Sequence, residues 1–495
     1  MDVVKIVGDA LGLSGRRAWS LFLSMATGYL VARLLGPAQF GLLAIFMLIP
    51  SLATYGSLGW DQGVMRELLH FQGRGDIHAA QRARATAYTA ELILAGVWVA
   101  VILAIAWGFI RDPTARTGLL LGAGGVLVAK LTQLCLVNAI VAKDFTLQVR
   151  AGMASATAGA MLKVAAAWWF GVVAVFAGML AAELLGLWVY WRARPLRFPL
   201  TLNASELRRL TRIGVPLALL TLLSGTTALT AYLSRSILGG LAGFEVLGLY
   251  VFASGLGCYL TGFVRDGIAA YRPHLLEGLA NASDRAAVFQ LMAKPAVTVA
   301  YATAVGGSCM LAFLPAFINL TLPRFVPIIP LLPVFFFGAF LTCVVHLPGL
   351  LLSSAFANQQ AFYTKCWAAA VGVSAALLWT FTRWGWGLTG AAWASLALPL
   401  CVAALALPRT YAYYLVGWRQ GARHALEQMG PLAYVALVHA AAGRLDLQFT
   451  AHPVLDQLAV GVLALAISCA PLLTRAYRLF DLRRFLPLQY QPSIG

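Results

Sequence analysis

The chain has 495 residues, of which 61% are hydrophobic and 11% charged, and its mean hydropathy is +0.80. Soluble globular proteins contain roughly 45–50% apolar and about 25% charged residues. The composition therefore excludes a soluble enzyme, a disordered scaffold and a secreted disulfide-rich protein, and it indicates a polytopic membrane protein. All seven cysteines lie in apolar stretches and form no C-x-x-C pair, which favours buried thiols over a disulfide framework or a zinc site.

The apolar runs predict an all-α protein with about 14 transmembrane helices, because a helical span needs about 20 mostly apolar residues. The runs are too continuous for barrel strands, whose side chains alternate with a period of two. In chain order, the predicted spans cover residues 18–35, 40–65, 86–109, 118–142, 148–170, 172–191, 213–233, 246–264, 295–314, 327–352, 364–381, 387–407, 429–442 and 453–473. No small-residue cleavage site accompanies the first span, so we expect an uncleaved anchor rather than a signal peptide.

The basic residues are distributed unevenly between the two sides of the predicted membrane protein. The formal net charge is +18, and most of the 36 lysine and arginine residues fall in the connections on one side. By the positive-inside rule that side is cytoplasmic, and both termini lie there. The basic residues are scattered over short segments without a soluble domain, so we expect no nucleic-acid partner.

The largest basic linker divides the chain after the sixth predicted span. It covers residues 192–212. We therefore predict an N-lobe of six spans (1–212), a C-lobe of six spans (213–410) and a tail with spans 13 and 14 and a cytoplasmic C-terminus (411–495).

A short internal repeat supports this division. Residues 33–37 (RLLGP) and 40–42 (FGL) resemble residues 235–239 (RSILG) and 247–250 (LGLY), and both phrases fall between the first and second spans of their lobe. Because six spans separate them, the two lobes share one orientation, as in a parallel repeat about an axis along the membrane normal. Transporters with such repeats place substrate sites between the repeats near the midplane.

Two segments resemble a known family. Residues 32–46 (ARLLGPAQFGLLAIF), followed by GWDQ at 59–62 and Arg66-Glu67, are similar to the opening of polysaccharide-export flippases, and residues 385–393 (GWGLTGAAW) resemble the element before that family's twelfth span. These flippases form the O-antigen and exopolysaccharide branch of the multidrug/oligosaccharidyl-lipid/polysaccharide (MOP) superfamily. The resemblance implies a MATE-like fold with a V-shaped cavity between the lobes. It also implies alternating access that moves an undecaprenyl-diphosphate-linked oligosaccharide from the inner to the outer leaflet.

Ionisable residues inside the spans are the first functional candidates, because a diphosphate needs a polar path across hydrocarbon. Those within or at the rim of the spans are Arg33, Asp61, Glu91, Lys130, Lys163 and Glu183. Their charges sum to zero, so pairing inside a lobe is an alternative explanation. Lys130 and Glu183 are expected either in such a pair or in the cavity, Lys163 either lines the cavity or snorkels, and Glu91 is solvated or paired near the inner face.

The second and eighth spans end alike. Asp61 precedes Arg66, and Arg265 and Asp266 precede Arg272, which suggests that both lobes present charge to an inner vestibule. The ordinary positive-inside flank is the alternative. We predict proton or cation coupling at Asp61, with Asp266 and Glu183 as further candidates. The predicted substrate contacts are Arg66, Arg265, Lys130, Arg272, Lys163, Arg33 and Arg235, and the last two lie at the outer rim.

The driving force is expected to be a gradient or the substrate itself. The sequence contains no G-x-x-x-x-G-K-[ST] loop, nucleophile elbow or paired metal ligands, so we expect no cofactor, with H⁺ or Na⁺ coupling open. Expected partners are membrane lipids and a polysaccharide polymerase in a bacterial inner membrane. Three alternatives stay open: a lipid II flippase, a cation-coupled multidrug antiporter, and a membrane glycosyltransferase or ligase.

Overall fold

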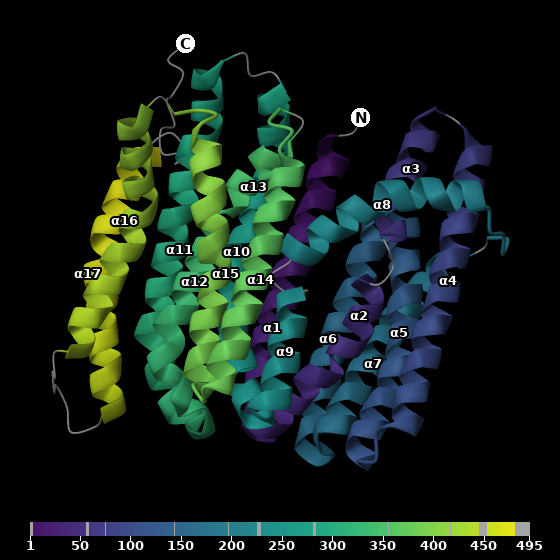
Figure 1. Cartoon of the computed structure of the whole chain (residues 1–495), viewed down its shortest axis with the longest axis horizontal. Coiled ribbons are helices and arrows are strands. Elements are labelled where there is room, and N and C mark those ends of the chain that lie inside the picture. The colour runs from purple at the N-terminus through teal and green to yellow at the C-terminus, as the bar shows by residue number, and fades with distance from the viewer. Residues whose placement is uncertain are drawn as a thin grey trace, which may run out of the picture. The chain divides into compact units, whose positions relative to one another are not determined.

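The computed structural model describes residues 3–55, 59–74, 76–142, 144–196, 198–224, 229–280, 284–354, 356–415, 417–444 and 453–480 (Figure 1). Within these ranges the secondary structure is helical and contains no strand. The predicted all-α class is therefore confirmed. The helices, in chain order, are α1 (Val3–Phe46), α2 (Leu48–Tyr55), α3 (Trp60–Arg74), α4 (Ile77–Gly108), α5 (Pro113–Val141), α6 (Phe145–Trp169), α7 (Gly171–Ala193), α8 (Ala204–Ser224), α9 (Leu229–Leu241), α10 (Phe244–Ala280), α11 (Arg285–Thr321), the 3₁₀ helix η1 (Pro323–Leu331), α12 (Leu332–Val344), α13 (His346–Ser353), α14 (Gln360–Arg383), α15 (Gly387–Tyr411), α16 (Gly417–Arg444) and α17 (Pro453–Phe480).

The helices pack into two compact units. Unit 1 comprises Met1–Phe252 with Leu378–Ala391, and unit 2 comprises Ala253–Leu377 with Ala392–Gly495. These units are defined by packing, and the predicted lobe boundaries after residues 212 and 410 stay a prediction. In unit 2, α11 packs against α16 and α17, and an apolar cluster around Leu275, Met292 and Leu351 forms part of its core.

Aspartate residues cap the N-termini of several helices. Asp76, Asp112 and Asp144 each accept a hydrogen bond from the backbone N–H three residues on, at the starts of α4, α5 and α6. This N-cap satisfies a donor that the first turn cannot pair internally. At Asp144 the Leu147 N–H and the Arg194 guanidinium hold the pKa of the carboxyl below its ordinary value.

Ten helical stretches among the described residues are long and apolar enough to cross a membrane. They confirm a multi-pass membrane protein, and the predicted total of about 14 stays a prediction. Some predicted spans lie outside these ten stretches. They are the part of the second span beyond residue 51, the fifth span on α6, the seventh on α8 and α9, and the thirteenth on α16.

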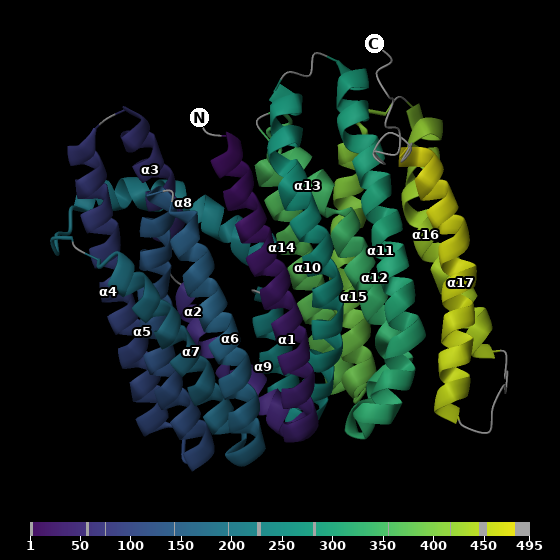
Figure 2. The same ribbon diagram turned by 180° about the vertical axis from the view of Figure 1, so that it is seen from behind.

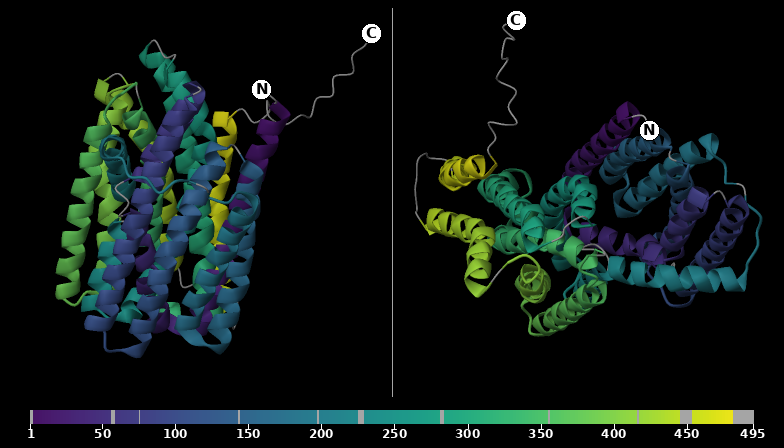
Figure 3. Two further views of the ribbon diagram at one scale, coloured as in Figure 1. Left: turned by 90° about the vertical axis from the view of Figure 1, so that its right-hand side faces the viewer. Right: turned by 90° about the horizontal axis from the view of Figure 1, so that it is seen from above.

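Three predicted spans are not single continuous helices, and one of them, the tenth (327–352), is divided among η1, α12 and α13. The second (40–65) is divided among α1, α2 and α3, and Gly59 immediately before α3 has φ +73°, a conformation that interrupts an α-helix. The seventh (213–233) is divided between α8 and α9. Figures 2 and 3 show α8 lying across the other helices of unit 1, close to the end at which α1 begins. Its arginines Arg208, Arg209 and Arg212 are exposed while Leu210 is buried, as expected for an amphipathic helix.

The two repeat phrases contact each other within unit 1. A side chain at Gly41 of α1 would overlap the carbonyl oxygen of Phe244, and one at Gly248 of α10 would overlap the carbonyl oxygen of Pro37. The two contacts are reciprocal, since Pro37 and Phe244 each stand four residues before the glycine that the other helix approaches. The absence of a β-carbon therefore lets the two helices approach at backbone distance, as small residues do in membrane proteins.

We predict that Gly248→Ala destabilises the protein by about 1–3 kcal/mol, because the added methyl group must displace backbone rather than a flexible side chain. Thermal unfolding of the detergent-solubilised protein measures the effect. Gly240→Ala is the control, because a side chain at this position in α9 meets no atom within 4 Å. Equal unfolding temperatures for the two variants would show that the close approach is not needed.

Candidate functional site

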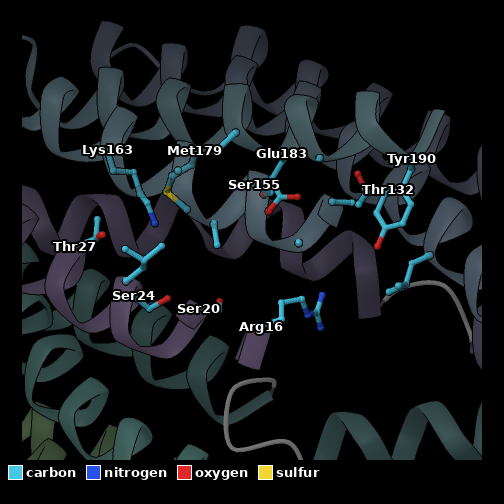
Figure 4. Close-up of a pocket in the computed structure, with 18 residues that line it drawn as sticks. Arg16, Ser20, Ser24, Thr27, Thr132, Ser155, Lys163, Met179, Glu183 and Tyr190 are labelled. Carbon is cyan, nitrogen blue, oxygen red and sulfur yellow. The ribbon is translucent and has the colours of Figure 1, made fainter. Parts of the chain in front are cut away.

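A polar cavity lies inside unit 1, between α1, α5, α6 and α7 (Figure 4). Its volume is about 340 Å³. Hydroxyl groups from all four helices line it, together with three charged side chains, in a protein whose helices are otherwise strongly apolar. The lining polar residues are Arg16, Ser20, Ser24, Thr27, Thr132, Ser155, Lys163, Glu183 and Tyr190.

One face of α1 supplies a row of polar side chains to this cavity. Arg16, Ser20, Ser24 and Thr27 are separated by four, four and three residues, a spacing that places them on one side of a helix. The row is about 17 Å long at the helical rise of 1.5 Å per residue. Figure 4 shows it facing Lys163 of α6 and Glu183 of α7. The cavity is therefore an elongated polar groove along the helices.

Small residues on α6 make room for the groove. Gly152 and Gly159 line it, and a side chain at Gly152 would overlap the Arg16 guanidinium. Outside the groove lining, α1 and α6 are joined by a hydrogen bond of 3.1 Å from Trp19 Nε1 to Thr157 Oγ1. The small residues of α6 therefore serve this opening as well as helix packing.

The charges in the groove are not neutralised by direct pairing. Among the described residues, no ion pair within 4 Å involves Arg16, Lys163 or Glu183. With two cations, one carboxylate and several hydroxyls, the groove suits a polar ligand that carries negative charge and hydroxyl groups. Arg16 and Lys163 offer the charge-assisted donors that bind phosphate oxygens.

A second polar cluster lies between α3, α4 and α5. Lys130 Nζ is 2.8 Å from Glu91 Oε2, and both side chains are 1% exposed. Gln133 Nε2 donates to Asp61 Oδ2 at 2.5 Å. The predicted pairing of Lys130 inside a lobe is thus present, but its partner is Glu91 rather than Glu183.

The other predicted site residues are distributed over both units. In unit 1, Arg33 donates to the Tyr29 hydroxyl at 3.3 Å and Arg235 donates to the Ala44 carbonyl oxygen at 3.1 Å. In unit 2, Arg265 and Arg272 are exposed on α10. The side chains of Arg66 and Asp266 lie outside the described residues. The roles proposed for all of them stay predictions.

Sequence analysis missed Arg16, Thr132, Ser155 and Tyr190 as candidate site residues. Arg16 fits the basic flank of the first predicted span, and its spacing from Ser20, Ser24 and Thr27 also indicates a polar helix face. The structure joins this face to Lys163 and Glu183, which were predicted separately. In unit 2, His439 Nε2 of α16 lies 2.9 Å from Ser308 Oγ of α11.

Comparison with known proteins identifies the fold. Over 96% of this chain and 100% of the other, the structure matches a lipid II flippase, MurJ, in an inward closed conformation, with a TM-score of 0.68 at 10% identity. It also matches an inward-facing multidrug resistance MATE family transporter of the MOP superfamily, with a TM-score of 0.60 at 14% identity, over 80% and 95% of the two chains. This is the MOP-superfamily fold.

The sequence comparison agrees with the structural one. Residues 30–270 match the family described as polysaccharide biosynthesis protein. Comparison with curated proteins gave no match. A further structure with the MOP fold, a transporter from Pyrococcus furiosus whose binding pocket is described as having reverse polarity, matches with a TM-score of 0.52 at 14% identity over 85% and 96% of the chains. The resemblance to MOP-superfamily flippases stated from the sequence is confirmed.

We predict that Lys130→Met destabilises the MOP-fold protein by about 3–5 kcal/mol, because it leaves the Glu91 carboxylate buried without its cation. Adding Glu91→Gln should recover most of this loss, since two neutral side chains then replace the pair. Thermal unfolding of both variants at neutral pH measures the difference. A double variant no more stable than Lys130→Met would contradict the pairing.

Proposed function

We propose that this protein is a bacterial inner-membrane flippase for undecaprenyl-diphosphate-linked oligosaccharides. It moves them from the cytoplasmic to the periplasmic leaflet by alternating access, with both of its termini in the cytoplasm. The product supplies a polymerase that builds O-antigen or exopolysaccharide. The polysaccharide biosynthesis family match and the MOP fold support this proposal.

The polar groove of unit 1 is the observation that carries the proposal. An unpaired charge in hydrocarbon costs tens of kcal/mol by Born estimates, so a diphosphate needs cations and hydroxyls along its path. Arg16 and Lys163 would bind phosphate oxygens, and the serine and threonine hydroxyls would replace water around the sugars. The lipid tail meanwhile stays in the bilayer.

The membrane potential favours this direction of transport. An inside-negative potential contributes about 2.3 kcal/mol per charge per 100 mV to the outward movement of an anion. Removal of the product by polymerisation would pull the equilibrium the same way. Both effects act without ATP, in agreement with a chain that has no phosphate-binding loop.

A lipid II flippase is the second candidate, because a protein described by that activity matches almost the full length of this chain. Its substrate would present the same diphosphate to the groove but a different glycan. The third candidate, a multidrug antiporter, shares the fold. A groove with two cations and one carboxylate is poorly suited to cationic drugs.

The deciding experiment is a deletion strain in which the undecaprenyl-linked oligosaccharide is quantified and its leaflet determined. The proposal expects accumulation on the cytoplasmic face together with loss of surface polysaccharide. Unchanged lipid-linked glycan with new sensitivity to cationic drugs would support the antiporter instead. Trapped lipid II with normal polysaccharide would support the second candidate.

We predict that Arg16→Gln and Lys163→Met each slow flipping about tenfold or more, since a charge-assisted hydrogen bond contributes about 1.5–3 kcal/mol. Initial rates in proteoliposomes containing the lipid-linked oligosaccharide measure this. Arg150→Gln is the matched control, because Arg150 is exposed on α6 and does not line the groove. Wild-type rates in both groove variants would exclude the groove as the path of the headgroup.

A further inference from the structure

The polar groove of unit 1 carries its two cations at different levels along α6. A side chain at Gly152 would overlap the Arg16 guanidinium, which places this cation beside Gly152. The side chain of Lys163 extends back along α6, so that its Cε lies 3.7 Å from the position of a β-carbon at Gly159. Gly159 follows Gly152 by seven residues, which is about 10 Å at the helical rise of 1.5 Å per residue. The two cations are therefore too far apart to act on one small group.

Glu183 lies at the level of Lys163. Its neighbour in α7, Ala182, faces Gly159, with 3.3 Å between the Ala182 β-carbon and the position of a β-carbon at Gly159. The Glu183 carboxylate and the Lys163 ammonium attract each other, yet no ion pair within 4 Å joins them in the part of the chain that the structure describes. This level thus offers a donor and an acceptor of opposite charge and has no net charge.

The hydroxyl groups of α1 follow the same order. Arg16 lies at Gly152, and Trp19, further along α1, donates a hydrogen bond further along α6, so the two helices run in the same direction. Thr27 therefore reaches the level of Lys163, as Figure 4 shows. The groove has two sections: a cationic section of Arg16, Ser20 and Tyr190, and a mixed section of Thr27, Lys163 and Glu183.

A diphosphate suits the cationic section better than the mixed one. Its two phosphates share a bridging oxygen, so their charged oxygens lie close together and occupy one section. A guanidinium binds phosphate oxygens through paired charge-assisted hydrogen bonds, whereas the Glu183 carboxylate repels them. Arg16 also precedes the first predicted span, so under the proposed function it lies at the height of the cytoplasmic headgroups. A lipid diphosphate reaches Arg16 without first crossing hydrocarbon.

A sugar ring suits the mixed section. Each sugar hydroxyl both donates and accepts, so two neighbouring hydroxyls can donate to Glu183 and accept from Lys163 at the same time. A carboxylate on the sugar has no proton to donate to Glu183 and is repelled by it. Lys163 alone would favour an acidic sugar, and Glu183 removes that preference. The mixed section therefore discriminates between neutral and acidic sugars.

We propose that the groove binds the diphosphate in the cationic section and the first sugar in the mixed section, and that Glu183 selects for a neutral first sugar. This inference rests on the proposed function and names the substrate class of its groove. The substrates are lipid diphosphates whose first sugar is uncharged and carries two neighbouring free hydroxyls. Lys163 meets the phosphate oxygens only after the headgroup has moved along the groove.

Two synthetic probes that differ at one carbon test the selection. They are short-chain polyprenyl diphosphates that carry either glucose or glucuronic acid, and native mass spectrometry measures their binding to the purified full-length protein. We expect the wild type to bind the glucosyl probe about tenfold more tightly, because the carboxylate of the other probe faces Glu183. Equal wild-type affinities, or tighter binding of the glucuronyl probe, would overturn the proposal, and this comparison needs no variant.

Glu183→Gln should abolish the preference for the glucosyl probe by removing the repulsion. Glu245→Gln is the matched control, because Glu245 is exposed at the start of α10 and does not line the groove, and it should retain the wild-type ratio of affinities. A wild-type ratio in Glu183→Gln would assign the selection to another residue and overturn the proposal.

Arg16→Gln tests the order of the two sections. We expect it to weaken the binding of both probes by the same factor, about tenfold, and to leave their ratio unchanged, because both carry the diphosphate that Arg16 binds. In the reverse order, Arg16→Gln would change the ratio, and Glu183→Gln would strengthen the binding of both probes equally. Either of these results would overturn the proposal.

Flipping of the same two lipids in proteoliposomes separates this inference from the proposed function. Faster flipping of the glucosyl lipid would support both. Equal flipping rates would overturn the selection by Glu183 and leave the proposed function in place. Absence of flipping, with the preference in binding retained, would disprove the proposed function and still support the groove as a site for neutral glycosyl diphosphates.

Discussion

The cost of placing charge among apolar helices constrains the whole of unit 1. Two lysines of its helices, the buried Lys130 and the half-buried Lys163, meet this cost in different ways. Lys130 is paired with Glu91 at 2.8 Å and excluded from solvent, whereas Lys163 opens into a cavity with Glu183 and Arg16 but forms no ion pair within 4 Å among the described residues. A lysine in a buried ion pair is not available to bind a ligand anion, whereas a lysine without an ion-pair partner in a groove can bind one. Under the proposed function, Lys163 is therefore the candidate for binding, and Lys130 belongs to an internal pair.

The close approach of the repeat phrases is a second constraint, and it acts on the backbone. Gly41 and Gly248 bring α1 and the start of α10 together reciprocally. Arg235 adds a hydrogen bond to the Ala44 carbonyl oxygen, and Phe40 packs edge-on against Phe252 with ring centres 6.2 Å apart. Residues that resemble each other in sequence therefore contact each other in space. A larger side chain at Gly41 or Gly248 would push the two helices apart, which explains why both phrases carry glycine at this position.

Composition predicted the helical class and the membrane location because hydropathy is averaged over about 20 residues and tolerates local error. The same averaging cannot detect a change of chain direction, so the interruption at Gly59 and the transverse course of α8 were missed. The pairing of Lys130 with Glu91 depends on how α4 and α5 are rotated against each other, which a single sequence does not encode locally. The polar helix face from Arg16 to Thr27 could be predicted from the spacing of its residues. Arg16 also fits the basic flank that the positive-inside rule expects, which hides this role.

The position of α5 gives the two polar regions a common mechanical element. One side of the helix carries Lys130 and Gln133, and another carries Thr132, whose buried hydroxyl oxygen has no hydrogen-bond partner among the described residues. Interiors packed at near-crystalline density do not deform gradually, so a small rotation of α5 must exchange one set of contacts for another. Under the proposed function, a ligand in the groove and the buried Lys130–Glu91 pair therefore act on the same helix.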